Sequence, residues 1–276
     1  MTKRKIRFLL LAILLSAVFV VSGIQIYGEL AARQKEKNEF EELAALVEAS
    51  QPDSMPWPDM EPEDGEEAMP EPEATEPAGA EEALRDLSAL FARNGDCIGW
   101  LSIPDTAVDY PVMHTPENPQ KYLRRSFYGE YSVSGVPFLD SRCSLGGDNL
   151  IIYGHNMNDE TMFAHILAMT DQATFDAART FYILTPTQNY RCRTYALDVV
   201  KNTETNILQP NFADEAAMRS YMTARINDSA VGAPTDVDLA SVTKLFTLIT
   251  CGDDYANTRA VLCGGCVEQA TPANAE

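Results

Sequence analysis

A mechanism that depends on histidine has few choices in this sequence. The 276 residues include three histidines, His114, His155 and His165, and six cysteines. His155 comes just after an apolar run, 149–153, and Gly154 before it leaves the backbone free to place a ring at the end of a strand. His114 leads into a proline-rich turn and His165 falls in a predicted helix, so packing or surface roles suit both. His155 is therefore the candidate acid–base residue.

Cys251 differs from the other cysteines in its setting. It ends the apolar run 244–250 and is followed by Gly-Asp-Asp-Tyr, so we expect its thiol at the mouth of a sheet. Arg259 opens the next β-like run, and a tight connection would bring it back beside Cys251. A thiolate is populated at neutral pH when a positive charge is near, and an acyl-transfer intermediate needs a donor for its oxyanion. Cys251, His155 and Arg259 could together carry out nucleophilic acyl transfer.

A second chemistry is suggested by the C-x-x-C pair Cys263 and Cys266. Such a pair can act as a thiol–disulfide oxidoreductase when it opens a helix after a strand, where the helix dipole lowers the thiol pKa. Here the pair ends a β-like run and no helix follows, so a local disulfide or two reduced structural thiols fits better. A zinc site would need a second pair of ligands from distant cysteines. These are Cys97, Cys143 and Cys192.

No sequence pattern indicates a metal or a cofactor. The glycine-rich nucleotide-binding patterns and the calcium-binding loop pattern are absent from the sequence. Asp253 and Asp254 could orient His155, but an acidic pair in a turn is more often solvated. We expect no cofactor and no metal ligands.

The elements that must position these residues are short and rich in β-formers. Eight such runs are separated by clusters of Gly, Pro, Asn and Asp. They cover 97–103, 107–113, 135–140, 149–154, 180–185, 190–200, 244–250 and 258–264. This pattern predicts a mainly β fold, an eight-stranded barrel with helical insertions, because closure removes exposed sheet edges. Helices are expected at 212–227, at 161–169 and around 84–91.

The N-terminal region contains a segment with the length and composition of a transmembrane helix. Phe8 to Tyr27 is uncharged over twenty residues, enough to span about 30 Å of hydrocarbon, and four basic residues lie within 3–7. The positive-inside rule then keeps the N-terminus in the cytoplasm and places the rest of the chain outside. A cleaved signal peptide is the alternative, with a cleavage site near Ala31 that lies beyond Glu29. Both interpretations export the folded domain.

The net charge of −20 is unevenly distributed. Residues 1–38 carry +5, residues 39–86 carry −16 and residues 87–276 carry −9. The acidic balance argues against nucleic-acid binding, which needs a basic surface. Proline and like charges in 51–80 predict an extended spacer, since they cannot bury enough apolar surface to offset ordering entropy. A specific acidic binding site in this stretch is the alternative.

These features divide the chain into six expected parts. They are a cytoplasmic basic tail (1–7), a transmembrane anchor (8–28), an extracellular helical segment (29–50), an acidic Pro-rich linker (51–80), a folded catalytic domain (81–268) and a C-terminal tail (269–276).

Three local patterns resemble the signatures of the sortases, the cysteine transpeptidases of Gram-positive cell surfaces. They are YGHNM around His155, TLITC ending at Cys251, and Arg259 on the following strand. The resemblance covers about 94–268. NGDCIGWLSIPDTAVDYPVM, GVPFLD, the Met-Phe pair that follows the histidine motif and the helix before the cysteine strand are similar to class B members in particular.

The resemblance implies a function and a set of partners. Cys251 would attack the threonine carbonyl of a C-terminal sorting motif in a secreted protein and form a thioester. His155 would transfer protons, and Arg259 would hold the oxyanion. The acceptor would be an amine of peptidoglycan or of a pilin, and the enzyme would be a single-pass protein of the cell membrane. Ile249 departs from the serine common at this position in class B relatives, which affects the expected substrate contact there.

Two other function classes remain as alternatives. One is a membrane-tethered extracytoplasmic oxidoreductase that uses Cys263 and Cys266. The other is a non-catalytic adhesin or wall-binding module, which would have no reason to place a cysteine at a strand end beside an arginine.

Overall fold

We describe the protein from a computed structural model, which covers residues 3–48, 87–234, 237–251 and 257–270. The chain divides into two compact units, residues 1–42 and 43–276. Helix α1 (Lys3–Glu48) is continuous, so the helical segment expected after the membrane span is an extension of the same helix. Within the described residues, Ile13–Val47 is long and apolar enough to cross a membrane, a test that a signal sequence also passes.

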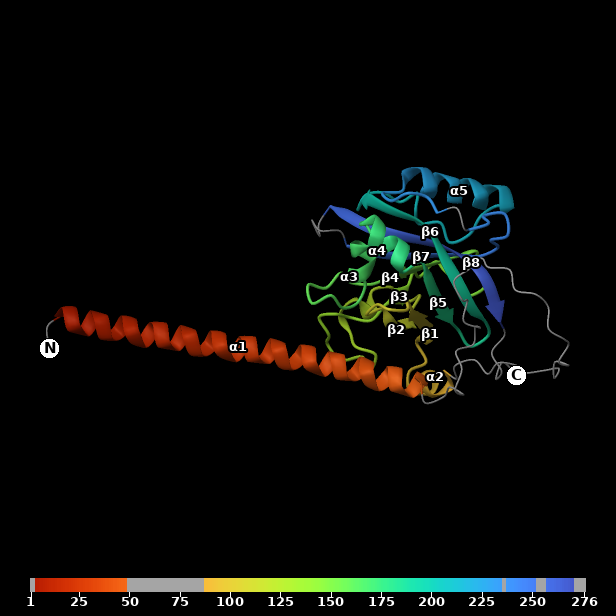
Figure 1. Cartoon of the computed structure of the whole chain (residues 1–276). Coiled ribbons are helices and arrows are strands. Elements are labelled where there is room, and N and C mark those ends of the chain that lie inside the picture. The colour runs from red at the N-terminus through yellow and green to blue at the C-terminus, as the bar shows by residue number, and fades with distance from the viewer. Residues whose placement is uncertain (1–2, 49–86, 235–236, 252–256, 271–276) are drawn as a thin grey trace, which may run out of the picture. The chain divides into compact units, whose positions relative to one another are not determined.

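Eight strands close into one barrel in the order β1-β2-β3-β4-β7-β8-β6-β5 (Figure 1). Their bounds are β1 (Cys97–Ser102), β2 (Asp109–Met113), β3 (Phe138–Leu139), β4 (Asn149–Tyr153), β5 (Thr180–Leu184), β6 (Asn189–Lys201), β7 (Leu245–Cys251) and β8 (Thr258–Ala270). Each of the eight predicted runs overlaps one strand, so the predicted eight-stranded barrel is confirmed. Strand β8 is longer than its predicted run because it pairs with β6 along its whole length.

The parallel pairing of β4 with β7 is the feature of the barrel that matters most for function. Tyr153 at the end of β4 is in register with Ile249 near the end of β7. Both strands are nearly continuous apolar runs, as expected for strands covered on both faces. Because the two strands run in the same direction, the chain leaves both of them at the same end of the barrel. Residues that follow β4 and residues that end β7 therefore meet.

The barrel core is filled by aromatic and aliphatic side chains. Trp100, Phe181 and Phe246 are fully buried, and the rings of Phe181 and Phe246 meet edge to face with centroids 6.2 Å apart. Gly264 makes room for this packing, since a Cβ there would lie 2.3 Å from the Phe181 ring. The core therefore fixes where β8 can lie against β5 and β6.

Short helices interrupt the strands. They are α2 (Ser88–Arg93), the 3-10 helix η1 (Lys121–Arg124), α3 (Ala164–Ala168), α4 (Gln172–Ala177) and α5 (Glu215–Asp228). The expected helix 161–169 is limited to α3. The expected helix 212–227 begins three residues late because the Asp214 side chain caps α5 by accepting a hydrogen bond from the Ala217 N–H at 2.8 Å.

Helix α5 is fastened to the barrel by a buried ion pair. The Arg225 guanidinium donates to the Asp198 carboxylate on β6 at 2.5 Å, and both side chains are almost fully buried. Arg225 also donates to Asp228 at the end of the helix, at 3.0 Å. Helix α5 is thus held against β6.

Candidate active site

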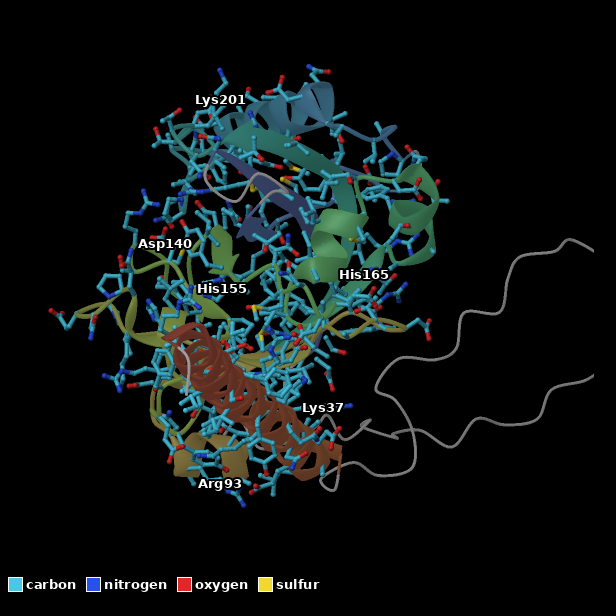
Figure 2. The ribbon with its side chains drawn as sticks, turned by 90° about the vertical axis from the view of Figure 1, so that its left-hand side faces the viewer. Lys37, Arg93, Asp140, His155, His165 and Lys201 are labelled. Atoms are coloured by element: carbon cyan, nitrogen blue, oxygen red, sulfur yellow. The ribbon has the colours of Figure 1, made fainter. Side chains whose placement is uncertain are left out.

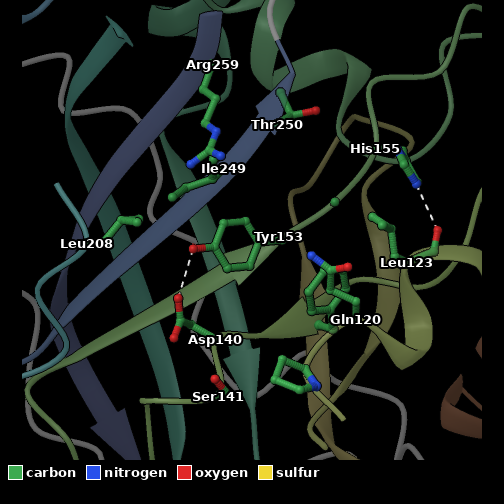
Figure 3. A pocket seen from close by; sticks show the side chains of 13 residues that line it. Gln120, Leu123, Asp140, Ser141, Tyr153, His155, Leu208, Ile249, Thr250 and Arg259 are labelled. Carbon is green, nitrogen blue, oxygen red and sulfur yellow. Dashed lines mark hydrogen bonds between the residues drawn. The ribbon is translucent and has the colours of Figure 1, made fainter. Parts of the chain in front are cut away.

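A cavity of about 380 Å³ opens where β4 and β7 end and β8 begins (Figure 3). It is lined by Pro119, Gln120, Leu123, Phe138, Asp140, Ser141, Tyr153, Gly154, His155, Leu208, Ile249, Thr250 and Arg259. Two of the three residues singled out from the sequence, His155 and Arg259, therefore line the same cavity. Its size is that of a small-ligand or peptide pocket.

The strand register brings Cys251 and Arg259 together. Cys251 is the last residue of β7 and is directly opposite Arg259 on β8. Directly opposed residues in antiparallel strands have their Cα atoms about 4.5–5.5 Å apart. The side chain of Cys251 lies outside the described part of the structure, as do residues 252–256 with Asp253 and Asp254.

Arg259 is half-buried, and the Nε of its guanidinium is held by a hydrogen bond. Its Nε donates a hydrogen bond to the Asn202 side-chain oxygen at 3.1 Å. Figure 3 shows the side chain running from β8 toward Ile249, above the Tyr153 ring. The terminal nitrogens of the guanidinium thus lie at the cavity wall, where an anion could be bound bidentately.

His155 is placed by the backbone that follows β4. The Gly154 N–H donates to the Ile249 carbonyl at 3.0 Å, which extends the β4–β7 pairing to the residue before the histidine. The sequence suggested that Gly154 is needed for backbone freedom, but the reason is space. A Cβ at Gly154 would lie 2.6 Å from the buried Phe163 ring. Phe163 and Gly154 together fix the start of the segment that carries His155.

The His155 ring has one defined partner and a lowered pKa. Its Nε2 lies 2.9 Å from the Leu123 carbonyl oxygen, shown as a dashed line in Figure 3. A carbonyl can only accept, so Nε2 carries a proton and Nδ1 of the neutral ring is the basic nitrogen. Burial lowers the pKa of His155 below its usual 6.5, and the charge of Arg124 lowers it further, while the Leu123 carbonyl acts in the opposite direction. The ring is therefore neutral at neutral pH.

Tyr153 and Asp140 are cavity residues that the sequence analysis did not select. The Tyr153 hydroxyl donates to the Asp140 carboxylate at 2.8 Å, and Arg142 donates to both Asp140 oxygens through Nε at 2.8 Å and a terminal nitrogen at 2.7 Å. Although burial acts to raise it, the pKa of Asp140 is lowered by the hydrogen bonds from Arg142 and Tyr153. The sequence feature that could have pointed to Asp140 is its place at the end of the β-like run 135–140, two residues before Arg142.

The Tyr153 ring forms one wall of the cavity. It packs against Phe138 with ring centroids 5.5 Å apart, and burial raises the pKa of its hydroxyl well above the usual range. The hydroxyl therefore stays protonated and remains a donor to Asp140. An ionised carboxylate, a fixed phenol and the Arg259 guanidinium thus line the cavity together with apolar side chains such as Ile249 and Leu208.

The other histidines do not belong to this cavity. Asp140 and His155 line the same cavity, whereas His165 belongs to α3 (Figure 2). Neither His114 nor His165 lines the cavity, and burial lowers the pKa of both rings. Their placement agrees with the packing roles expected from the sequence.

The C-x-x-C pair does not have the setting of a redox site. Cys263 and Cys266 lie inside β8 and not at the end of a strand, and both are free and buried. Burial raises the pKa of both thiols, so neither is an accessible thiolate. The pair therefore lacks the setting that the oxidoreductase alternative requires, and the two residues are free core side chains with no disulfide between them.

Comparison with known proteins agrees with this geometry. Residues 101–266 match the model of the sortase domain. Sortase B of Listeria monocytogenes is 31% identical over 185 residues, which cover 66% of this chain and 72% of that protein. Sortase B of Staphylococcus aureus is 25% identical over 174 residues, covering 62% of this chain and 70% of that protein.

The fold comparison gives the same family. The crystal structure of Clostridium perfringens sortase B superposes with a TM-score of 0.61 at 25% identity and covers 66% of this chain and all of that one (100%). The match of the family model over more than half of the chain, together with these relatives, shows that the chain belongs to the sortase family of cysteine transpeptidases, and that it is similar to class B members.

Proposed function

We propose that this chain is a membrane-anchored sortase that cleaves a C-terminal sorting motif in secreted proteins and transfers them to an amine of peptidoglycan or of a pilin. The observation that carries the proposal is the register of β7 and β8, which sets Cys251 opposite Arg259 at the edge of the cavity that His155 also lines. Nucleophile, proton carrier and oxyanion donor are the parts that acyl transfer requires.

In the first half-reaction, the Cys251 thiol gives its proton to Nδ1 of the neutral His155 ring as its sulfur bonds to the carbonyl carbon of the scissile threonine. The carbonyl π electrons move to oxygen, and Arg259 donates hydrogen bonds to the resulting oxyanion. When the tetrahedral intermediate collapses, the carbon–nitrogen bond breaks and the amine departs with a proton from His155. The product is a thioester between Cys251 and the threonine.

In the second half-reaction, the acceptor amine replaces the leaving peptide. His155 takes a proton from the amine as its nitrogen bonds to the thioester carbon, and the sulfur departs as thiolate. The Leu123 carbonyl supports this role because it holds Nε2–H and leaves Nδ1 of the neutral ring as the proton acceptor. The low pKa of His155 keeps that nitrogen unprotonated at neutral pH.

The N-terminal part of the chain supports a location at the outer face of the membrane. Helix α1 contains the candidate span, with basic residues on its N-terminal side. Residues 51–80, which lie outside the described part of the structure, are rich in proline and acidic residues, a composition that favours a spacer between anchor and domain. A tethered enzyme of this kind meets secreted proteins as they leave the membrane.

The proposal is tested with the full chain in detergent micelles, a panel of peptides of the N-P-x-T and S-P-x-T-G types, and triglycine as the amine. We expect mass spectrometry to find a thioester on Cys251 and a triglycine-linked product. Cys251→Ala and His155→Ala should lose cleavage and transfer. The control Cys266→Ser, which changes a buried thiol away from the cavity, should keep both activities. Wild-type transfer by Cys251→Ala would refute the proposal.

A further inference from the structure

Arg259 has a side-chain partner that lies outside the cavity and has no assigned role. Asn202 is the first residue after β6, and its side-chain oxygen accepts the hydrogen bond from Arg259 Nε at 3.1 Å. We infer that Asn202 is a positioning residue, which sets the orientation of the Arg259 guanidinium for the oxyanion. This inference rests on the proposed function.

The backbone holds Asn202 in place for this contact. Val200 and Lys201 are in register with Arg259 and Thr258, so Asn202 continues the β6–β8 pairing by one residue. The Asn202 N–H donates to the Asn257 carbonyl at 2.8 Å. Asn202 is thus tied to β8 through its backbone and through its side chain, at the corner where the chain enters β8.

The contact restricts the guanidinium in a way that suits anion binding. An arginine side chain has several rotatable bonds, so an unrestrained guanidinium samples many directions. A hydrogen bond to Nε fixes the plane of the group and leaves its terminal nitrogens directed elsewhere. Figure 3 shows this side chain extended from β8 toward Ile249 at the cavity wall. The donor is then already oriented when negative charge develops on the substrate, which is the condition for effective oxyanion stabilisation.

The neutral side chain of Asn202 also suits the role of orienting Arg259. Its amide oxygen accepts a hydrogen bond without adding a negative charge beside the arginine. A carboxylate at this position would form an ion pair with Arg259 and weaken its attraction for the oxyanion. A neutral acceptor orients the guanidinium and leaves its full positive charge for the reaction.

The test is a double-mutant cycle in the full chain, with thioester formation and triglycine transfer as the readouts. Asn202→Ala should lower kcat about tenfold, with KM within about twofold of wild type, because the transition state alone uses the oriented donor. The same substitution in an Arg259→Lys background should cause no further loss, since lysine has no Nε–H for Asn202 to hold. Thr203→Ala, an exposed neighbouring substitution, is the matched control and should behave as wild type.

The outcomes separate a positioning role from a structural one. Two results would overturn the inference. One is that Asn202→Ala lowers kcat by the same factor in the Arg259→Lys background as in the wild type. The other is that kcat of Asn202→Ala stays within twofold of wild type. If Asn202→Ala does not fold, Asn202→Ser replaces it, because its hydroxyl is one bond shorter and cannot span the distance to Nε. A wild-type chain that forms no thioester would refute the proposed function itself, and that result is distinct from an active wild type whose Asn202 variant is unchanged.

Discussion

At the scale of single residues, the site depends on a few groups whose charge is set by neighbours. Burial and the nearby Arg124 charge keep His155 neutral, whereas hydrogen bonds from Arg142 and Tyr153 keep Asp140 ionised. The same cavity therefore holds a neutral base and a fixed anion. Both states follow from local desolvation and hydrogen bonding, which act over a few ångströms.

The pH dependence of kcat/KM should report the lowered pKa of His155. We expect the acid limb of the profile to have its midpoint below 6.5, since the ring must lose a proton before it can act. Arg124→Gln removes a positive charge that disfavours the imidazolium, so the pKa rises and the acid limb moves to higher pH. The measurement is the rate of peptide cleavage between pH 4.5 and 9.

Arg125→Gln is the control for this prediction. Arg125 is also exposed, and its terminal nitrogen donates to the Gly129 carbonyl at 2.7 Å, while Arg125 is not among the groups that shift the pKa of His155. The acid limb of the kcat/KM profile of Arg125→Gln should therefore coincide with that of the wild type. If the acid limbs of Arg124→Gln and of the wild type have the same midpoint, the charge of Arg124 does not affect the pKa of His155.

At the scale of elements, helix α5 is held on β6 by a charged pair that has little contact with water. Asp198 and Arg225 are buried, and each would be a costly unpaired charge without the other. Leu208, which lines the cavity, lies in the connection from β6 to this helix. The helix that the pair holds therefore follows a connection that contributes one residue to the cavity wall.

Removal of one partner should destabilise the domain strongly. Arg225→Met leaves the buried Asp198 carboxylate unpaired, and we expect the free energy of unfolding to fall by about 3–5 kcal/mol. Urea denaturation followed by tryptophan fluorescence measures the change. The double variant Arg225→Met with Asp198→Leu removes both charges and should recover most of the loss. A single variant as stable as the wild type would mean that water reaches the carboxylate.

A second prediction at this scale concerns the junction of β4 with the His155 segment. Gly154→Ala introduces a methyl group 2.6 Å from the Phe163 ring, and we expect a loss of about 1–3 kcal/mol in stability together with lower activity. Phe163→Leu in the same chain should restore part of the stability by making space. Thermal melting and peptide cleavage are the two measurements. The substitution Gly146→Ala is the control, because no atom lies within 4 Å of a Cβ at that position.

At the scale of the whole molecule, the sequence joins an apolar N-terminal segment, an acidic proline-rich stretch and a modestly acidic domain. Their net charges differ so much that the overall value of −20 describes none of them. The acidic charge is concentrated in 39–86, whereas residues 87–276, which include the barrel, carry −9.

The anchor is distinguished from a cleaved signal by the N-terminus of the mature protein. We expect the chain to stay in the membrane fraction after alkaline carbonate washing, and mass spectrometry to find peptides from residues 29–37 joined to the segment before them. A mature protein that begins near residue 33 and is released by the wash would instead show that a signal peptide had been removed. If the anchor is retained, extracellular protease should remove the folded domain from intact cells.

Much of the fold and part of the site follow from local patterns in the sequence. Alternating and continuous apolar runs between turn residues predict the eight strands, because strand formation depends on nearby side chains. The setting of His155 and Cys251 at the ends of apolar runs marks them as candidates for the same reason. The C-x-x-C pair could not be placed this way, since its burial depends on β6, which pairs with β8.

Only the tertiary structure decides which ends of which strands meet. The parallel pairing of β4 with β7 brings the His155 segment to the end of the Cys251 strand, although the two are distant in sequence. The same holds for Asp140 with Tyr153 and for Asn202 with Arg259, contacts made by residues from different strands and connections. Such contacts depend on register and closure of the whole barrel. The sequence by itself thus determined the strands and the reactive residue types, and the closed barrel decided the partners that set their charge and direction.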